Sequence, residues 1–154
     1  MKNKIVADRA KLKDIVAELQ SQGKKIVFTN GCFDLIHVGH VRYLRDAKDL
    51  GDVLVIGLNA DSSVSSIKPG RPVTPENERS EVLASLEMVD YVTLFSEDTP
   101  YELIKEIRPD ILVKGADWEI DNIVGKDLVK EVRTIPFVEG ISTSNIIKKI
   151  QALS

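Results

Sequence analysis

The sequence predicts an α/β fold: a Rossmann-like, doubly wound, five-stranded parallel sheet in a single domain. Short apolar runs alternate along the chain with segments of helical periodicity, as they do in repeated strand and helix units. No internal repeat, low-complexity tract or linker interrupts this alternation. A length of 154 residues suits one domain, which we divide into an N-terminal helix at 1–23 and a core at 24–154.

The composition is that of an ordinary soluble globular protein, with 43% hydrophobic and 29% charged residues. A net charge of −3 gives no general attraction to nucleic acid or to a membrane surface, so we expect neither as a partner. The N-terminus lacks the apolar core of a signal peptide, and no apolar run is long enough to span a bilayer. Because Cys32 is the only cysteine, no intrachain disulfide can form, and we expect a cytoplasmic protein.

The first elements are a helix, a strand and a second helix. A capped amphipathic pattern over residues 8–22 predicts a helix that packs on the outside of the domain or against a partner. A buried strand is expected at 26–28, followed by a turn at Asn30-Gly31. Apolar residues at helical spacing then predict a helix that begins near His37.

The remainder continues the alternation. A near-continuous apolar run at 53–58 predicts a central strand, and the polar segment 59–73 after it predicts a long functional or mobile loop. Next comes a helix capped by Thr74, with Val82, Leu83 and Leu86 on its buried face. The remaining strands are expected at 91–95, 111–113 and 134–138, and the remaining helices at 99–108, 126–131 and 142–151.

His37 and His40 are the only histidines, and they stand three residues apart at the start of a predicted helix. Unpaired backbone N–H groups and the positive end of the helix dipole favour an anion there. Gly39 between them lets a ligand approach the backbone closely. Two neutral imidazoles that donate to a phosphate would stabilise charge developing during displacement at phosphorus. Surface histidines or a metal pair are the alternatives, but no acidic or thiol cluster supplies further metal ligands.

A second helix start carries three hydroxyls, at Ser142, Thr143 and Ser144. Such residues are ordinary caps, and they are also good phosphate ligands with the helix dipole behind them. Two helix N-termini at one edge of a parallel sheet, each able to bind phosphate, point to a nucleotide. The same helix is expected to bury Ile146, Ile147 and Ile150.

Two loops at this sheet edge add candidate residues. Lys68 and Arg71 lie in the first loop and could reach a substrate phosphate, although solvated surface charge is an equally good interpretation. The segment 114–118 leaves the fourth strand at the same edge, and its Trp118 would shield a base or pack within the protein. For Cys32, packing is favoured over a nucleophilic role.

The segments from Gly31 to His40 and from Gly140 to Asn145 resemble the cytidylyltransferase-like nucleotidyltransferase superfamily. Its signature is a His-x-Gly-His box followed later by an Ile-Ser-Thr box. From about Lys24 to the C-terminus, the resemblance is closest to the adenylyltransferases that make ADP-heptose from heptose 1-phosphate and ATP for lipopolysaccharide precursors.

Departures from the pattern bear on the nucleotide. The related glycerol-phosphate cytidylyltransferases carry Arg-Thr just before the Ile-Ser-Thr region, where this chain has Phe137-Val138. Conversely, Asp117-Trp118 and Glu139-Gly140 look like the cytidylyltransferase version. The resemblance therefore implies ATP, with CTP and glycerol 3-phosphate as the alternative.

The resemblance implies direct in-line attack of the sugar 1-phosphate on the α-phosphorus, with release of pyrophosphate and no covalent enzyme intermediate. The catalytic residues that it implies are His37, His40 and Lys149. The nucleotide-binding residues that it implies are Gly31, Cys32, Phe33, His37, Gly39, His40, Lys114, Gly115, Asp117, Trp118, Ile141, Ser142, Thr143 and Ser144. The implied substrate-binding residues are Asn30, Asp34, Lys68 and Arg79, and Asp34 is expected to fix its own turn rather than to act as a base.

Cofactor and partners follow from the same resemblance. Mg²⁺ is expected to enter with the nucleotide triphosphate, which supplies most of its ligands, so no metal site made of protein side chains is expected. The resemblance also implies a homodimer. The alternative of another class is a nucleotide-binding regulatory module without catalysis, and the intact histidines and hydroxyls favour the enzyme.

Overall fold

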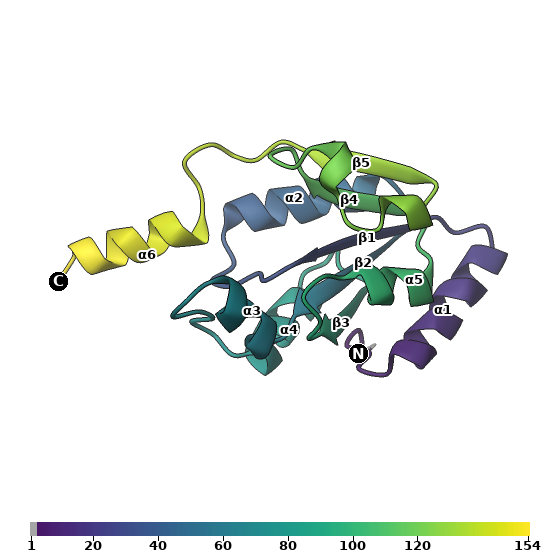
Figure 1. Cartoon of the computed structure of the whole chain (residues 1–154), viewed down its shortest axis with the longest axis horizontal. Coiled ribbons are helices and arrows are strands. Elements are labelled where there is room, and N and C mark those ends of the chain that lie inside the picture. Colours follow the sequence, from purple (N-terminus) through teal and green to yellow (C-terminus); the bar gives the residue numbers. More distant parts are fainter. Residues whose placement is uncertain (1–2) are drawn as a thin grey trace.

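The computed structural model describes residues 3–154, and its centre is a parallel β-sheet of five strands (Figure 1). The strands are β1 (Ile26–Gly31), β2 (Val53–Asn59), β3 (Tyr91–Phe95), β4 (Ile111–Gly115) and β5 (Glu131–Ile135). They lie in the order β3-β2-β1-β4-β5, and every neighbouring pair is parallel. From β1 to β3 the chain adds strands on one side of β1, and it then adds β4 and β5 on the other side. Open α/β sheets bind ligands beside such a switch point, which here lies between β1 and β4.

Helices connect the strands and cover both faces of the sheet, so the predicted doubly wound fold is confirmed (Figure 1). The α-helices are α1 (Arg9–Ser21), α2 (Val38–Asp49), α3 (Asp61–Ile67), α4 (Glu76–Ala84), α5 (Tyr101–Ile107) and α6 (Thr143–Ala152). Two short 3-10 helices lie at Ile120–Asn122 and Lys126–Leu128. None of the helices within residues 3–154 has the length and apolar character needed to cross a bilayer.

Alternate residues of the central strands supply two separate cores. Phe28 of β1 packs with α1 and α5 on one face, whereas its neighbour Val27 packs with α2 and α4 on the other. All residues of β2 are buried, as the apolar run predicted for a central parallel strand. Each fully buried Leu, Ile or Phe side chain stabilises the fold by about 1.5–3 kcal/mol.

The N-terminal helix α1 packs within the chain. Asp8 caps it by accepting hydrogen bonds from the backbone N–H groups of Ala10 and Lys11. Leu12 and Val16 are fully buried in the core shared with α5. The predicted helix is confirmed, and of its two predicted placements the one within the domain is the one observed.

The segment 59–73, predicted to be a loop, contains α3 (Asp61–Ile67). Serines have modest helix propensity, but here the hydroxyls of Ser63 and Ser66 donate to carbonyls three residues back, at 3.0 and 2.9 Å. Val64 is fully buried. Burial of this side chain outweighs the local preference for irregular structure.

Helix α4 departs from its prediction in its cap and its buried face. The hydroxyl of Thr74 donates to Asp34 instead of capping the helix, and Pro75 occupies the N-cap position without a side-chain bond. Leu83 is fully buried, but Val82 is 46% exposed, so its predicted burial is wrong.

Two strand boundaries also differ from the prediction. β1 continues through Asn30-Gly31, where a turn was expected, because both residues pair with β2. β5 begins at Glu131 rather than at residue 134, and Glu131 pairs with Ile111 of β4. Pairing with a neighbouring strand, which local sequence does not encode, decides both boundaries.

Helix α6 projects from the domain (Figure 1). None of its residues is buried, and Ile150 is 58% exposed, so the predicted burial of Ile146, Ile147 and Ile150 is wrong. An amphipathic period shows that a helix has an apolar face, but it does not show which surface covers that face.

Residues that precede α1 pair with the outer edge of the sheet. The N–H of Val6 donates to the carbonyl of Val92, and the N–H of Val92 donates to the carbonyl of Lys4, both at 2.9 Å. This parallel bridge centred on Ile5 covers part of β3.

Candidate active site

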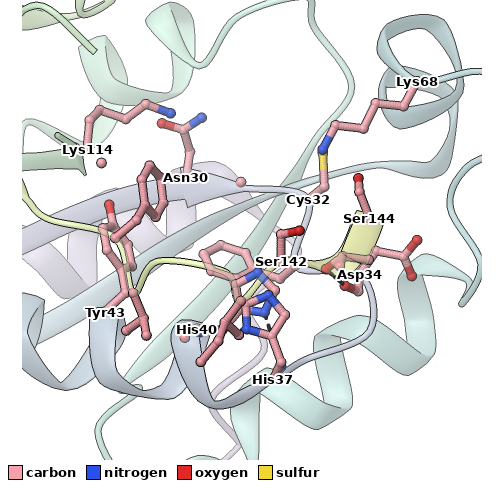
Figure 2. Close-up of a pocket in the computed structure, with 18 of the residues that line it drawn as sticks. Asn30, Cys32, Asp34, His37, His40, Tyr43, Lys68, Lys114, Ser142 and Ser144 are labelled. Atoms are coloured by element: carbon pink, nitrogen blue, oxygen red, sulfur yellow. Dashed lines mark hydrogen bonds between the residues drawn. The ribbon is translucent and has the colours of Figure 1, made fainter. Parts of the chain in front are cut away.

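A pocket of about 380 Å³ opens at the carboxyl ends of β1 and β4, beside the switch point (Figure 2). The predicted site residues that line it are Asn30, Gly31, Cys32, Phe33, Asp34, His37, Gly39, His40, Lys68, Lys114, Gly115, Trp118, Ile141, Ser142, Thr143 and Ser144. Arg71, the other candidate phosphate contact of the first loop, also lines the pocket, as do Tyr43, Val64, Phe137 and Val138. The fold therefore brings together segments that are more than one hundred residues apart in the sequence.

The two histidines form a reciprocal cap at the start of α2. Nδ1 of His37 accepts from the backbone N–H of His40, and Nδ1 of His40 accepts from the backbone N–H of His37, both at 3.3 Å. The rings stack with centroids 3.8 Å apart and planes inclined by 21°. Because each Nδ1 is an acceptor, the proton of each neutral ring is assigned to Nε2, which leaves two N–H donors for a ligand.

Burial keeps both rings neutral. It lowers the pKa of His37, and it lowers the pKa of His40 to about 4. Electrostatic repulsion from His37 and Lys68 disfavours a second positive charge and lowers the pKa of His40 further, whereas attraction to the carboxylate of Asp34 raises it. At neutral pH the pair therefore acts as two uncharged donors rather than as two cations.

Gly39 is required by the histidine stack. A Cβ at this position would lie 2.9 Å from Cε1 and Nδ1 of His37, closer than real Cβ contacts allow. The sequence indicated that Gly39 lets a ligand approach. The structure adds that it leaves room for the imidazole of His37.

Asp34 joins three walls of the pocket. Its carboxylate accepts from the N–H groups of Val73 and Thr74, at 2.7 and 3.1 Å, and from the Thr74 hydroxyl at 2.9 Å. Its carbonyl accepts from the hydroxyl of Thr143 at 2.6 Å. Burial alone would raise the pKa of Asp34, but these backbone bonds and the charge of Arg79 lower it overall. Asp34 thus secures a neighbouring loop and α6, rather than only its own turn.

The three hydroxyls before and within α6 have distinct partners. Ser142 caps the helix by accepting from the N–H of Asn145 at 3.0 Å. Thr143 donates to Asp34, and Ser144 accepts from Nη2 of Arg71 at 3.2 Å. The N-terminus of α6 is thereby held at the pocket although the rest of the helix projects away.

Arg79, predicted to contact a substrate, is buried behind the pocket wall, and its substrate contact stays a prediction. It is 1% exposed, lies outside the pocket lining, and pairs through Nη2 with Asp61 at 2.7 Å. Its remaining hydrogen bonds go to the carbonyls of Thr74, Cys32 and Asn59. All three guanidinium nitrogens are engaged, so Arg79 fixes the loops around the pocket from behind.

Two further predicted residues lie outside the lining. Lys149 is exposed on α6, beyond the turn that reaches the pocket, and its catalytic contact stays a prediction. Asp117 is exposed, and its charge raises the pKa of Lys114 against the lowering effect of burial. Within the described part of the chain, no group of three or more His, Cys, Asp or Glu side chains could hold a metal ion.

At the carboxyl end of β4, the pocket wall combines two aromatic rings with a lysine. Nζ of Lys114 lies 5.0 Å from the ring centroid of Trp118, and burial lowers the pKa of Lys114. Phe137 packs directly on Gly115, where an added Cβ would lie 2.3 Å from the ring. Figure 2 shows Lys114, Asn30 and Tyr43 on one side of the histidines, and Lys68 and Ser144 on the other.

Tyr43 is a lining residue that the sequence did not reveal. Its hydroxyl lies 2.8 Å from the hydroxyl of Thr29, which also bonds to the carbonyl of Val113. Burial raises the pKa of Tyr43 to about 12. Its position on α2, one turn after His40, was the available signal, but the helical pattern indicated only an ordinary helix face.

Comparison with known proteins gives matches over most of the chain. A family model described as cytidylyltransferase-like matches residues 28–149. "Bifunctional protein HldE" of a Nitratiruptor species is 53% identical over 96% of this chain, and that of Campylobacter curvus is 57% identical over 88%. The matched regions are 32% and 30% of those relatives, so the chain spans about a third of their length.

One solved structure is similar in fold and in sequence. It is described as that of the lipopolysaccharide core biosynthesis protein from Thermoplasma volcanium, with a TM-score of 0.64 and 31% sequence identity. The match covers 73% of this chain and 98% of that protein.

Proposed function

The chain belongs to the cytidylyltransferase-like family, and we propose that it is a nucleotidyltransferase that transfers AMP from ATP to heptose 1-phosphate. The products are ADP-heptose and pyrophosphate, for use in lipopolysaccharide precursor synthesis. Relatives named HldE and a similar structure described by lipopolysaccharide core biosynthesis support this choice of acceptor. One arrangement carries the proposal: a neutral, stacked His37 and His40 pair that shares a pocket with the hydroxyls of Ser142 to Ser144.

The proposed reaction is an in-line displacement at the α-phosphorus. The sugar 1-phosphate oxygen is already ionised at neutral pH, so no general base is needed. The Nε2–H groups of His37 and His40 donate to phosphate oxygens as negative charge develops during the displacement. The N-terminus of α6, with Ser142 and Ser144, binds the outer phosphates that leave as pyrophosphate.

The aromatic end of the pocket suits the nucleobase. Trp118 and Phe137 are 46% and 61% exposed, which leaves ring surface available to stack on a base. Lys114 adds a donor beside Trp118 for a ring nitrogen or carbonyl of the base. ATP is the proposed nucleotide on the basis of Phe137-Val138, which replaces the Arg-Thr of the cytidylyltransferases.

The proposal includes a cofactor, an assembly state and a location. Mg²⁺ is brought by the triphosphate, whose oxygens supply most of its ligands. The carboxylate of Asp34 accepts three hydrogen bonds, from Val73 and Thr74, and its place in the proposal is to hold that loop. The proposed assembly is a homodimer, and the proposed location is the cytoplasm.

The test is pyrophosphate release by the purified protein with Mg²⁺, using ATP and CTP in turn against heptose 1-phosphate and glycerol 3-phosphate. Release with ATP and heptose 1-phosphate alone is the expected result. Release with CTP and glycerol 3-phosphate alone would contradict the assignment of nucleotide and acceptor. Nucleotide binding without release in any pair would favour the regulatory module.

A further inference from the structure

The structure separates the two arginines that follow β2 into different roles. Arg79 is buried and its charge is paired with Asp61 at 2.7 Å. Arg71 lines the pocket, and within residues 3–154 its guanidinium makes a single hydrogen bond, to the hydroxyl of Ser144. Among residues 3–154 no carboxylate forms an ion pair with Arg71, so its positive charge is uncompensated beside the phosphate-binding hydroxyls.

The backbone around Arg71 is held in place. Its own N–H donates to the carbonyl of Lys68 at 3.1 Å. Two and three residues later, the N–H groups of Val73 and Thr74 donate to the buried carboxylate of Asp34. A guanidinium on an anchored loop loses less conformational entropy when it binds a ligand than one on a free loop.

The partner of Arg71 indicates which phosphates it reaches. Ser144 is in the first turn of α6, where backbone N–H groups and the helix dipole favour an anion. Figure 2 shows Lys68 on the same side of the histidines as Ser144, so a second cation lies on that side of the pocket. Arg71 therefore lies nearer the α6 end of the triphosphate than the reacting phosphorus.

We propose that Arg71 binds the β- and γ-phosphates of the nucleotide and, after transfer, the pyrophosphate. This inference rests on the proposed nucleotidyltransferase function. In the free protein the guanidinium donates to a neutral hydroxyl at 3.2 Å. Phosphate oxygens replace that acceptor with stronger, charge-assisted and bidentate bonds, and the freed Ser144 hydroxyl binds the same phosphates.

The experiment compares Arg71→Gln and Arg71→Lys with Arg45→Gln. Arg45 is an exposed arginine on α2 outside the pocket, so its substitution serves as the matched control. In Arg71→Gln, the KM for ATP and the inhibition constant of pyrophosphate should each rise about 10- to 100-fold. The KM for the sugar phosphate should change by less than about twofold, and Arg71→Lys should recover part of the loss.

Calorimetric titration of pyrophosphate into each variant keeps this inference separate from the proposed function. If the wild-type protein releases no pyrophosphate with any substrate pair, the proposed function fails, while the titration still tests Arg71. Unchanged pyrophosphate affinity in Arg71→Gln would overturn the inference, as would a loss confined to the KM of the sugar phosphate. Matching urea unfolding curves for the variants would show that a loss of affinity is not a loss of folding.

Discussion

The imidazoles of His37 and His40 cap each other's backbone N–H groups while their rings stack 3.8 Å apart. One pair of side chains therefore closes the N-terminus of α2 and presents two Nε2–H donors to the pocket. Structure and chemistry are tied to the same protonation state, because a proton on Nδ1 would remove the cap.

Replacement of His40 by Asn should lower turnover by about a hundredfold or more, because the Nε2–H donor to the reacting phosphate is lost. The amide oxygen of Asn can still accept from the N–H of His37, so the start of α2 should remain capped. Steady-state pyrophosphate release measures the change. Near-normal turnover in a folded variant would remove His40 from the mechanism.

Stability should fall as the pH is lowered from 6.5 toward 4. The pKa of His40 is about 4 in the folded protein and near 6.5 when unfolded, so the unfolded chain binds more protons within this window. Above pH 6.5 both states are neutral at this site and the effect vanishes. Urea unfolding at several pH values gives the free energy of unfolding as a function of pH. This free energy should fall less steeply with decreasing pH in His40→Asn than in the wild-type protein. Parallel slopes would contradict the low pKa.

Replacement of Arg79 by Met should lower the free energy of unfolding by about 3 kcal/mol or more, because buried carbonyl acceptors lose their donors. Arg45→Gln, at an exposed position, should change it by less than about 0.5 kcal/mol. Urea unfolding gives both values. Unchanged stability together with lost affinity for ATP would restore Arg79 as a substrate ligand.

Two buried threonines should respond in opposite directions to replacement by Val. The hydroxyl of Thr93 has no hydrogen-bond partner among the described residues, so Thr93→Val should be neutral or stabilise by up to about 1 kcal/mol. The hydroxyl of Thr29 bonds to Val113 and Tyr43, so Thr29→Val should destabilise by about 1 kcal/mol or more. Thermal unfolding of the two variants compares them directly, and equal shifts would contradict the assigned hydrogen bonds.

The sequence predicted the position of an element correctly where the pattern of apolar residues alone determines it. The apolar run at 53–58 predicted β2, because strands covered on both faces typically show such a near-continuous apolar run. The helical spacing of the apolar residues after His40 predicted that His37 and His40 stand at the start of α2. Both features depend on the succession of neighbouring residues, which can be read from a single sequence.

Other features depend on contacts between distant segments. The hydroxyl of Thr74 has two acceptable roles, and the approach of Asp34 selects the one that is not a cap. Arg71 and Arg79 have the same chemistry in the sequence, and only the fold shows which one faces the pocket. The exposed face of α6 belongs to the same class, since no local signal says what a helix packs against.

The short bridge between Ile5 and Val92 has a consequence for how these molecules behave at high concentration. An open sheet has two edge strands, and the unpaired backbone groups of each can form hydrogen bonds with a strand of another molecule. On β3 the bridge pairs the backbone groups of Val92, so they cannot bind another strand. On β5 the charged side chains of Arg133 and Glu131 disfavour the approach of another strand. Removal of the first six residues should therefore favour aggregation before it affects the chemistry at the opposite end of the strands.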